Sequence, residues 1–156
     1  VPIRFFDLKQ YASDAVAFVN SRVWGTLNAS IIMHPKSGRR HEVREVIDDV
    51  TQQLNAGTVA VNHWAALSYA LVTPPWGAFP GNVATDIGSG TGFVHNSFMF
   101  DRPQKTILEG PFRVFPKPVW FPSHRAAVEL SRRLLEFERE PSLANVARVV
   151  MSALKG

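Results

Sequence analysis

The chain has 156 residues, 46% hydrophobic and 19% charged, which is long enough for a domain with a hydrophobic core and excludes a disordered or fibrous protein. No apolar run approaches the roughly 20 residues that a bilayer span requires, so we expect a soluble protein with no membrane partner. The net charge of +4 could attract an anionic partner, but the basic residues are scattered among carboxylates, so we expect no nucleic-acid binding.

The hydrophobic pattern of the first 63 residues changes its period repeatedly and predicts the order β-α-β-α-β. Residues 1–8 form a short apolar stretch that predicts the first strand. A helix ending near Asn20 follows, because apolar residues recur at i, i+3, i+4 and i+7, namely Ala12, Ala15, Val16 and Val19. Residues 27–34 predict the second strand, and their nearly continuous apolar run favours burial on both faces, as in a parallel sheet.

A second helix and a third strand complete this α/β portion. Ser37 is placed to cap the helix, and Gly57 is placed to end it in a left-handed conformation. The expected apolar stripe consists of Val43, Val46, Ile47, Val50 and Leu54. Residues 58–62 predict the third strand. Strands joined by helices cross over and lie parallel, so we expect a parallel sheet with loops presented at its carboxyl edge.

Residues 71–122 differ in composition from the preceding α/β portion. They contain many glycines, prolines and aromatic residues, which predicts little regular structure. The exception is an edge strand at Lys105–Leu108, because Pro103 and Pro111 bracket it and proline is tolerated at such margins.

A helical hairpin is expected at the end of the chain. Ser123 and Ser142 are placed as N-caps of its two helices, and Pro141 separates them. The expected apolar stripes are Ala127, Leu130, Leu134 and Phe137 on one helix, and Leu143, Val146, Val150 and Leu154 on the other. We therefore divide the chain into an α/β portion at 1–110 and a proline-rich connector with a helical tail at 111–156.

The string from Asp86 to Gly92 resembles the glycine-rich first motif of S-adenosylmethionine-dependent methyltransferases. In that setting the glycines form a tight turn between a buried strand and a helix. Residues 80–85 do not predict a buried strand, and too few residues follow Gly92 for the rest of that fold. We favour a flexible glycine-rich loop and keep the methyltransferase as a weaker alternative.

Few other residues of the chain suggest catalysis or metal binding. The chain has no cysteine, which excludes disulfides, thiolate metal sites and a cysteine nucleophile. The five histidines lack metal-ligand spacing, so we expect no metal site. His63, beside Trp64, follows a predicted parallel strand, but a histidine hydrogen-bonded at a strand end is the commoner explanation.

Four carboxylates fall on one predicted helix and favour a solvated face over acid/base catalysis; they are Glu42, Glu45, Asp48 and Asp49. No G-x-S-x-G string supports a serine hydrolase. We assign no catalytic, cofactor-binding or metal-ligating residue to this chain.

Three strings, in order, resemble the C-terminal third of the catalytic domain of aldehyde dehydrogenases. The first is Ala-Val-Ala-Phe-Val-Asn at 15–20, followed by Trp-Gly-Thr-Leu at 24–27. The second, and most specific, is Leu-Asn-Ala-Gly-Thr-Val-Ala-Val-Asn at 54–62, similar to the family's helix end, Gly-Thr turn and strand. The third is Pro-Trp-Gly-Ala-Phe-Pro-Gly at 75–81. The resemblance covers about residues 1 to 110, and the order β-α-β-α-β agrees with it.

The resemblance implies an NAD(P)-dependent aldehyde oxidoreductase with a cysteine nucleophile, a glutamate base and a Rossmann domain. None of these can be placed here, and the nucleophile would precede Val1. The chain opens without methionine, which we interpret as the start of a cut chain. The partners expected are therefore the remainder of a parent polypeptide and, in the full protein, an aldehyde substrate and NAD or NADP.

Two sets of residues acquire roles by this resemblance. The loop from His63 to Gly81 would line the aldehyde tunnel with Trp64, Trp76 and Phe79, for which ordinary aromatic packing is the alternative. The strand of Lys105, Thr106, Ile107 and Leu108 would pair across a subunit interface by main-chain hydrogen bonds. We therefore expect a homo-oligomer, and we expect self-association of a chain whose apolar surface lacks its partners.

Departures from the family pattern lie in residues 62–75, in the tail at 111–156, and in the absence of the family's lysine near Phe79. The leading hypothesis is a C-terminal portion of a cytoplasmic aldehyde dehydrogenase-like enzyme that is inactive alone. The alternative is a non-catalytic module that oligomerises through Lys105–Leu108 and the tail helices.

Overall fold

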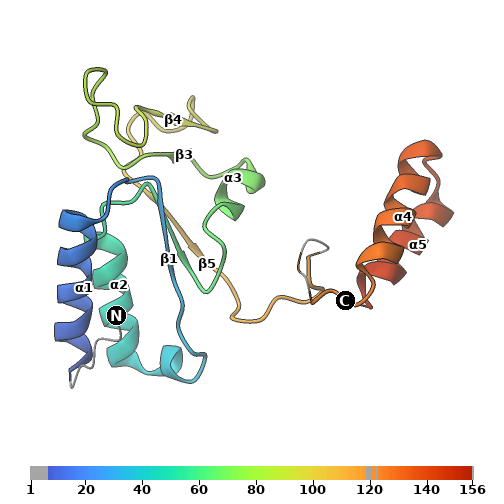
Figure 1. Cartoon of the computed structure of the whole chain (residues 1–156), viewed down its shortest axis with the longest axis horizontal. Helices are drawn as coiled ribbons and strands as arrows, with labels where there is room; N and C mark the ends of the chain where they lie inside the picture. The colour runs from blue at the N-terminus through green and yellow to red at the C-terminus, as the bar shows by residue number, and fades with distance from the viewer. Residues whose placement is uncertain (1–6, 119–120, 122, 156) are drawn as a thin grey trace. The chain divides into compact units, whose positions relative to one another are not determined.

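A computed structural model describes residues 7–118, 121 and 123–155 of the chain. It divides into two compact units, Val1–Phe112 and Arg113–Gly156, each described by itself. The first unit is mixed α/β and the second is helical (Figure 1). No helix in the described part of the chain is long and apolar enough to cross a membrane.

The first unit is built on a three-stranded parallel sheet in the order β1-β2-β5. Its strands are Asn28–Ile31 (β1), Thr58–Val61 (β2) and Thr106–Glu109 (β5). Helices α1 (Leu8–Arg22) and α2 (His41–Gln53) lie side by side along one face of the sheet (Figure 1). The parallel α/β arrangement expected from the sequence is confirmed.

Helix α1 begins earlier than expected. The carboxylate of Asp7 accepts a hydrogen bond from the backbone N–H of Lys9 at 3.0 Å, and Asp7 has the extended conformation of an N-cap. Leu8 is therefore helical rather than the last residue of a strand, and the rest of the expected strand, residues 1–6, lies outside the described residues. The helix buries Ala12 and Val16 and ends at Arg22.

The hydrophobic core lies between the two helices and β2. All four residues of β2 are buried, as its sequence favours. Val59 is fully buried with Val16, Leu54 and Ala56, while Val61 forms a second cluster with Met33 and Val43. The stripe predicted on α2 is confirmed as its buried and half-buried side.

Strand β1 is not covered on both faces, and that expectation is wrong. Its burial alternates, with Asn28 and Ser30 exposed on one face and Ala29 and Ile31 half-buried against the helices. No described strand flanks β1 on its other side. An edge strand is covered less completely than a central one, so only the helix-facing side of β1 enters the core.

Two expected boundary residues of α2 have other roles. Ser37 opens a 3-10 turn at Ser37–Arg39, and the N-cap of α2 is Arg40, whose side chain does not cap it. The helix ends before Gly57, which is not left-handed. A Cβ on Gly57 would lie 1.8 Å from the backbone oxygen of Gly77, so close packing requires this glycine.

Side chains distant in the sequence satisfy the carboxyl end of α2. The Lys105 ammonium group donates hydrogen bonds to the backbone oxygens of Thr51, Gln52 and Leu54 at 2.9, 2.7 and 2.7 Å. The Asn20 amide group donates to the backbone oxygen of Gln53 at 2.9 Å. These bonds supply the partners that the last carbonyls of a helix lack.

Regular structure between β2 and β5 is sparse, as expected. It consists of α3 (Leu67–Leu71) and an antiparallel pair, β3 (Trp76–Gly77) with β4 (Phe93–Val94), none of which the sequence pattern predicted. Strand β5 lies at the sheet edge and is shifted by one residue from the expected Lys105–Leu108. Lys105 is therefore not part of the strand.

The second unit is a hairpin of α4 (Ala127–Arg139) and α5 (Leu143–Ala153). The Ser142 hydroxyl accepts from the Asn145 backbone N–H, so Ser142 caps α5 as expected. Ser123 does not cap α4, whose N-cap is Ala126.

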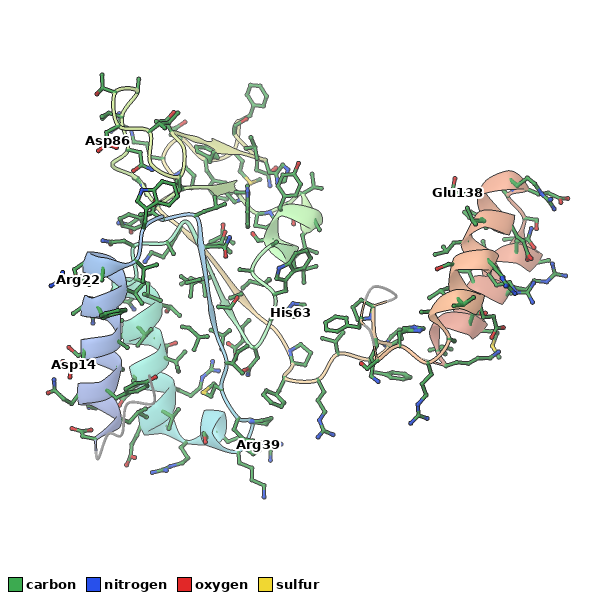
Figure 2. The ribbon with its side chains drawn as sticks, in the orientation of Figure 1. Asp14, Arg22, Arg39, His63, Asp86 and Glu138 are labelled. Carbon is green, nitrogen blue, oxygen red and sulfur yellow. The ribbon has the colours of Figure 1, made fainter. Side chains whose placement is uncertain are left out.

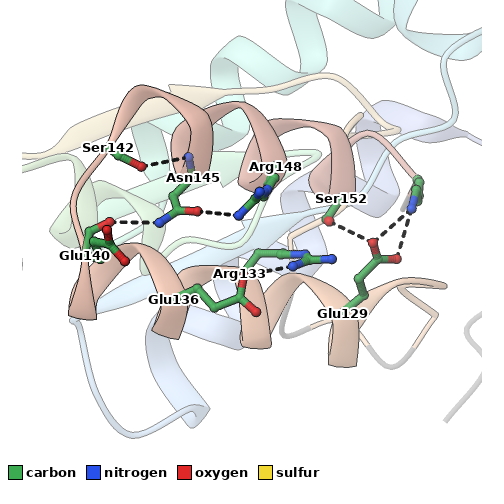
Figure 3. A network of polar contacts seen from close by, with 9 residues as sticks. Glu129, Arg133, Glu136, Glu140, Ser142, Asn145, Arg148 and Ser152 are labelled. Atoms are coloured by element: carbon green, nitrogen blue, oxygen red, sulfur yellow. Dashed lines mark hydrogen bonds and ion pairs between the residues drawn. The ribbon is translucent and has the colours of Figure 1, made fainter.

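The expected α5 stripe is exposed. The exposed fractions of its members are 90% for Leu143, 41% for Val146, 50% for Val150 and 48% for Leu154. The buried side of α5 carries Asn145 and Ser152 instead, and it joins a polar network with α4 (Figure 3).

Candidate functional site

The loop between β2 and β5 contacts the face of the sheet opposite α1 and α2, but it leaves Asn28 and Ser30 of β1 exposed on that face. Two residues of this loop, Ala65 and Ser68, are buried. The Thr106 hydroxyl donates to the backbone oxygen of Pro75 at 2.7 Å, and the register places Thr106 beside Thr58 on this face. A hydrogen bond between β5 and a backbone oxygen of the loop thus holds the proposed tunnel wall against the sheet.

Trp76, in β3, belongs to an aromatic group on this loop. Its ring lies edge-on to Tyr69, with centroids 5.8 Å apart and planes at 67°, and Tyr69 lies 5.1 Å from the ring of His95. Such edge-to-face pairs stabilise aromatic clusters. His95 has a positive φ of 67° and a buried Nδ1 atom without a hydrogen-bond partner in the described part of the chain.

Phe79 has different neighbours. Its backbone N–H donates to the Thr26 oxygen at 2.9 Å, and the Lys105 Nζ atom lies 5.2 Å from its ring centroid, within the range of a cation–π contact. Burial lowers the pKa of Lys105 from its ordinary value. Phe79 also lines a cavity of about 260 Å³, together with Arg102 and the glycine-rich segment.

Trp64 lies apart from Phe79. It is 60% exposed and follows His63 beyond the carboxyl end of β2, whereas Phe79 bonds to Thr26, which precedes β1. Figure 2 shows the same separation, with His63 near one end of the sheet and Asp86, in the glycine-rich loop, beyond the other. The structure therefore places Trp64 and Phe79 at opposite ends of the parallel strands.

The glycine-rich segment is a folded loop at the amino end of the sheet. Gly88, Gly90 and Gly92 have positive φ, and the Ser89 hydroxyl accepts from the Thr26 backbone N–H at 2.8 Å. An isolated bridge between residues 83 and 86 precedes the segment and β4 follows it. The strand-turn-helix setting of the methyltransferase motif is therefore not present here.

A second cavity, of about 370 Å³, lies beside this loop and was missed by sequence reasoning. Its wall includes Trp24, Thr26 and Ser89, and the Thr26 hydroxyl is buried without a hydrogen-bond partner in the described part of the chain. Trp24 is 84% exposed. The Trp-Gly-Thr-Leu string carries no local pattern that indicates that a distant loop packs against it.

The carboxyl edge of the sheet is closed by local contacts. The His63 Nδ1 atom accepts from the Trp64 backbone N–H at 3.0 Å, and the ring lies against Gly110, where a Cβ would meet it at 2.3 Å. The Asn62 side-chain oxygen accepts from the Met33 backbone N–H at 2.7 Å. His63 is therefore a hydrogen-bonded histidine at a strand end.

The other ionisable candidates lie on the surface of α2. All four carboxylates predicted to form a solvated face of α2 are exposed, namely Glu42, Glu45, Asp48 and Asp49. No cluster of three or more His, Cys, Asp or Glu residues that could hold a metal ion occurs among the described residues. One exposed pair joins α2 to the sheet: Arg44 binds both carboxylate oxygens of Glu109, the longer bond being 3.1 Å.

Comparisons with known proteins give no family for this chain. No protein-family model matches it, and neither a curated protein nor a solved structure does.

The outer edge of β5 is the feature that fits assembly. β2 pairs with one edge of β5, and no described strand pairs with the other. Ile107 is 53% exposed. Lys105 and Thr106, both expected at this edge, direct their side-chain hydrogen bonds to the end of α2 and to the loop. The residues left to offer a partner are Ile107 and the unpaired backbone beside it.

Proposed function

We propose that this chain is the C-terminal part of the catalytic domain of an NAD(P)-dependent aldehyde dehydrogenase-like oxidoreductase and is inactive alone. In that role its loop would line the substrate tunnel with Trp76 and Phe79, whereas Trp64 lies at the opposite end of the strands and would not belong to that wall. The chain would also supply the strand through which subunits pair. The observation that carries this proposal is the open outer edge of β5, a parallel strand with half-exposed Ile107.

Apolar surface at the opposite edge of the sheet supports the same proposal. Large apolar side chains are exposed on α1, just after α1 and just after β1; they are Phe18, Val23, Trp24 and Ile32. Exposed apolar side chains of this size are typical of a surface that packs against a partner. In the proposed parent, further strands and helices would cover this side, so both edges of the sheet would be occupied.

The chemistry would come from elsewhere in the parent. The chain has no cysteine, so it supplies no thiolate nucleophile. The glycine-rich loop does not fit a dinucleotide, because a pyrophosphate cradle needs a strand before it and a helix after it. We therefore assign NAD(P) binding to the remainder of the parent, and this chain would only shape the path of the aldehyde.

The decisive experiment is to determine the intact mass and sequence of the natural polypeptide that contains this chain. A polypeptide several times longer, with a cysteine and a glutamate upstream of Val1, is expected. The purified 156-residue chain should oxidise no aldehyde with NAD or NADP. A free-standing natural product of 156 residues would rule the proposal out.

A second candidate is a non-catalytic oligomerisation module. It is favoured by the apolar stripe of α5, whose members Leu143, Val146, Val150 and Leu154 are between 41% and 90% exposed. The two candidates differ in the natural polypeptide, since the module requires neither a Rossmann domain nor a cysteine upstream. The loop geometry does not support the methyltransferase hypothesis. Measurable binding of S-adenosylmethionine would be needed to support it.

A further inference from the structure

Helix α5 is polar on one side and apolar on the other, and its apolar side is exposed. Asn145 and Ser152 lie on the polar side, where they are buried and hydrogen-bonded to Glu140 and Glu129 (Figure 3). The apolar side carries the stripe from Leu143 to Leu154, and Met151 beside that stripe is 62% exposed. Apolar surface of this kind normally packs against a partner. The large side chains of this face are therefore available to something outside the hairpin.

The charge of the second unit narrows the choice of partner. The unit, Arg113–Gly156, holds eight Lys or Arg residues and four Glu residues, so it carries the whole net charge of +4 and the first unit is neutral. No acidic residue follows Glu140 in the sequence, and the charged side chains beyond it are Arg148 and Lys155. A positively charged unit attracts an anionic partner and repels a second copy of itself.

The size of the apolar side also argues against a second copy. Helix α5 has 11 residues, so its apolar side is a strip roughly 16 Å long and about 10 Å wide. Each partner of a standard protein interface buries about 800 Å², which is several times the area of this strip. Two such strips would form only a weak dimer, whereas a lipid surface accepts an apolar helix side without a matching shape.

An interfacial helix differs from a membrane span. The expectation of no membrane partner was based on the lack of an apolar run of roughly 20 residues. A helix that lies in the plane of a bilayer surface needs one apolar side, with basic residues on its polar side. Helix α5 has this arrangement, because Arg148 and Lys155 lie among its polar residues and its apolar stripe carries no charge.

The connector before α4 has a similar composition. Phe115 is 71% exposed and Phe121 is also exposed, and the basic residues Arg113 and Lys117 are close to them in the sequence. Aromatic and basic side chains together are typical of segments that lie at the headgroup level of a membrane. The connector and α5 belong to the same unit, so both favour the same kind of partner.

We propose that the second unit binds the surface of a bilayer that contains anionic lipids. The apolar side of α5 would lie among the acyl chains next to the headgroups, and the excess of basic side chains in the unit would be attracted to the lipid phosphates. This inference concerns the tail, outside the three motif strings, and it does not rest on the proposed oxidoreductase activity.

The test is co-sedimentation of the full chain with vesicles, either of phosphatidylcholine alone or of phosphatidylcholine mixed with phosphatidylserine. Binding to the mixed vesicles is expected, with weaker binding to phosphatidylcholine alone and at high salt. Leu143→Gln should weaken binding to the mixed vesicles roughly tenfold, because it removes one buried leucine. Leu135→Gln is the matched control, since Leu135 is 70% exposed but lies on α4, and it should leave binding unchanged.

A fluorescent label locates the contact. The chain has no cysteine, so a single introduced cysteine carries a polarity-sensitive dye at one known position. Emission from Val146→Cys should shift to the blue when mixed vesicles are added, and emission from Leu135→Cys should not shift. Circular dichroism on each variant establishes that the helices are folded.

Three results would overturn the proposal. The first is no binding to the mixed vesicles, and the second is equal binding to both kinds of vesicle. The third is an equal loss of binding in Leu143→Gln and Leu135→Gln, which would mean that α5 is not the contact. If vesicles are not bound and Leu143→Gln converts a dimer to a monomer in sedimentation velocity, the partner of α5 is a second copy instead.

Discussion

Replacing Lys105 with methionine should destabilise the first unit by detaching β5 from the end of α2. The ammonium group has three donors, and all three backbone oxygens that it contacts lie at 2.7–2.9 Å. Methionine keeps most of the aliphatic stem and removes the donors. The substitution therefore isolates the cap from the packing of the side chain.

The expected loss follows from two contributions. Hydrogen bonds to a charged group contribute about 1.5–3 kcal/mol in net terms, and a cation at a helix carboxyl end contributes roughly 0.3–1 kcal/mol. Burial lowers the pKa of Lys105, which shows that removing the ammonium group from water has a cost. We therefore expect a loss of about 2 kcal/mol, which corresponds to a fall in Tm of roughly 8 °C for a unit of this size.

Thermal unfolding followed by circular dichroism measures the change in global stability. Hydrogen exchange at the amides of the last turn of α2 tests whether the loss of stability is located there. Lys9→Met, on the exposed surface of α1, is the matched control and should change stability by less than about 0.5 kcal/mol. If Lys105→Met loses no more stability than Lys9→Met, the lysine is not a cap and the reasoning fails.

Gly57→Ala should destabilise the fold by about 3 kcal/mol, because the new Cβ would overlap a rigid backbone carbonyl of β3, whereas Gly38→Ala meets only the flexible end of a methionine and should cost far less in urea unfolding. Because Arg44 lowers the pKa of Glu109, the stability from this pair is present above the ordinary pKa of 4.5 and is lost as the pH falls through the folded-state pKa. The Tm of the parent chain should thus fall more steeply in acid than that of Glu109→Gln, and parallel Tm–pH curves would contradict this. Ile107→Lys should convert self-associated chains to monomers in light scattering, since a charge on an open edge opposes strand pairing; unchanged mass would exclude the β5 edge as the contact.

The core of the first unit was predictable because its signals are local. The stripe on α2 and the apolar residues of β2 have the periods of a helix and a buried strand, and both are buried as expected. The contacts that join distant segments left no such signal. Lys105 looked like the start of an edge strand, although its side chain caps α2, because a charge gives no indication of a partner more than fifty residues away.

The candidate site was predictable only as a list of aromatic residues. The motif strings singled out Trp64, Trp76 and Phe79, but they could not show that Trp64 and Phe79 lie at opposite ends of the strands. That separation follows from the loop, which runs from the carboxyl end of β2 back to the amino end of the sheet. The path of a loop is set by tertiary contacts such as the hydrogen bond from Phe79 to Thr26, and sequence periodicity does not encode these.

The α5 stripe shows a further limit of periodicity, which identifies an apolar side but not what that side faces. In the hairpin, Asn145 uses its amide to donate to the Glu140 backbone oxygen at 2.9 Å and its oxygen to accept from Arg148 at 3.0 Å. Ser142, one turn earlier, caps the helix through the Asn145 backbone N–H. The Ser152 hydroxyl and the Lys155 ammonium group donate to Glu129 of α4, and Asn145 and Ser152 lie on the buried side of α5. The apolar side is left outward, so the hairpin gains little hydrophobic stabilisation of its own, and its stability should depend on whatever covers that side.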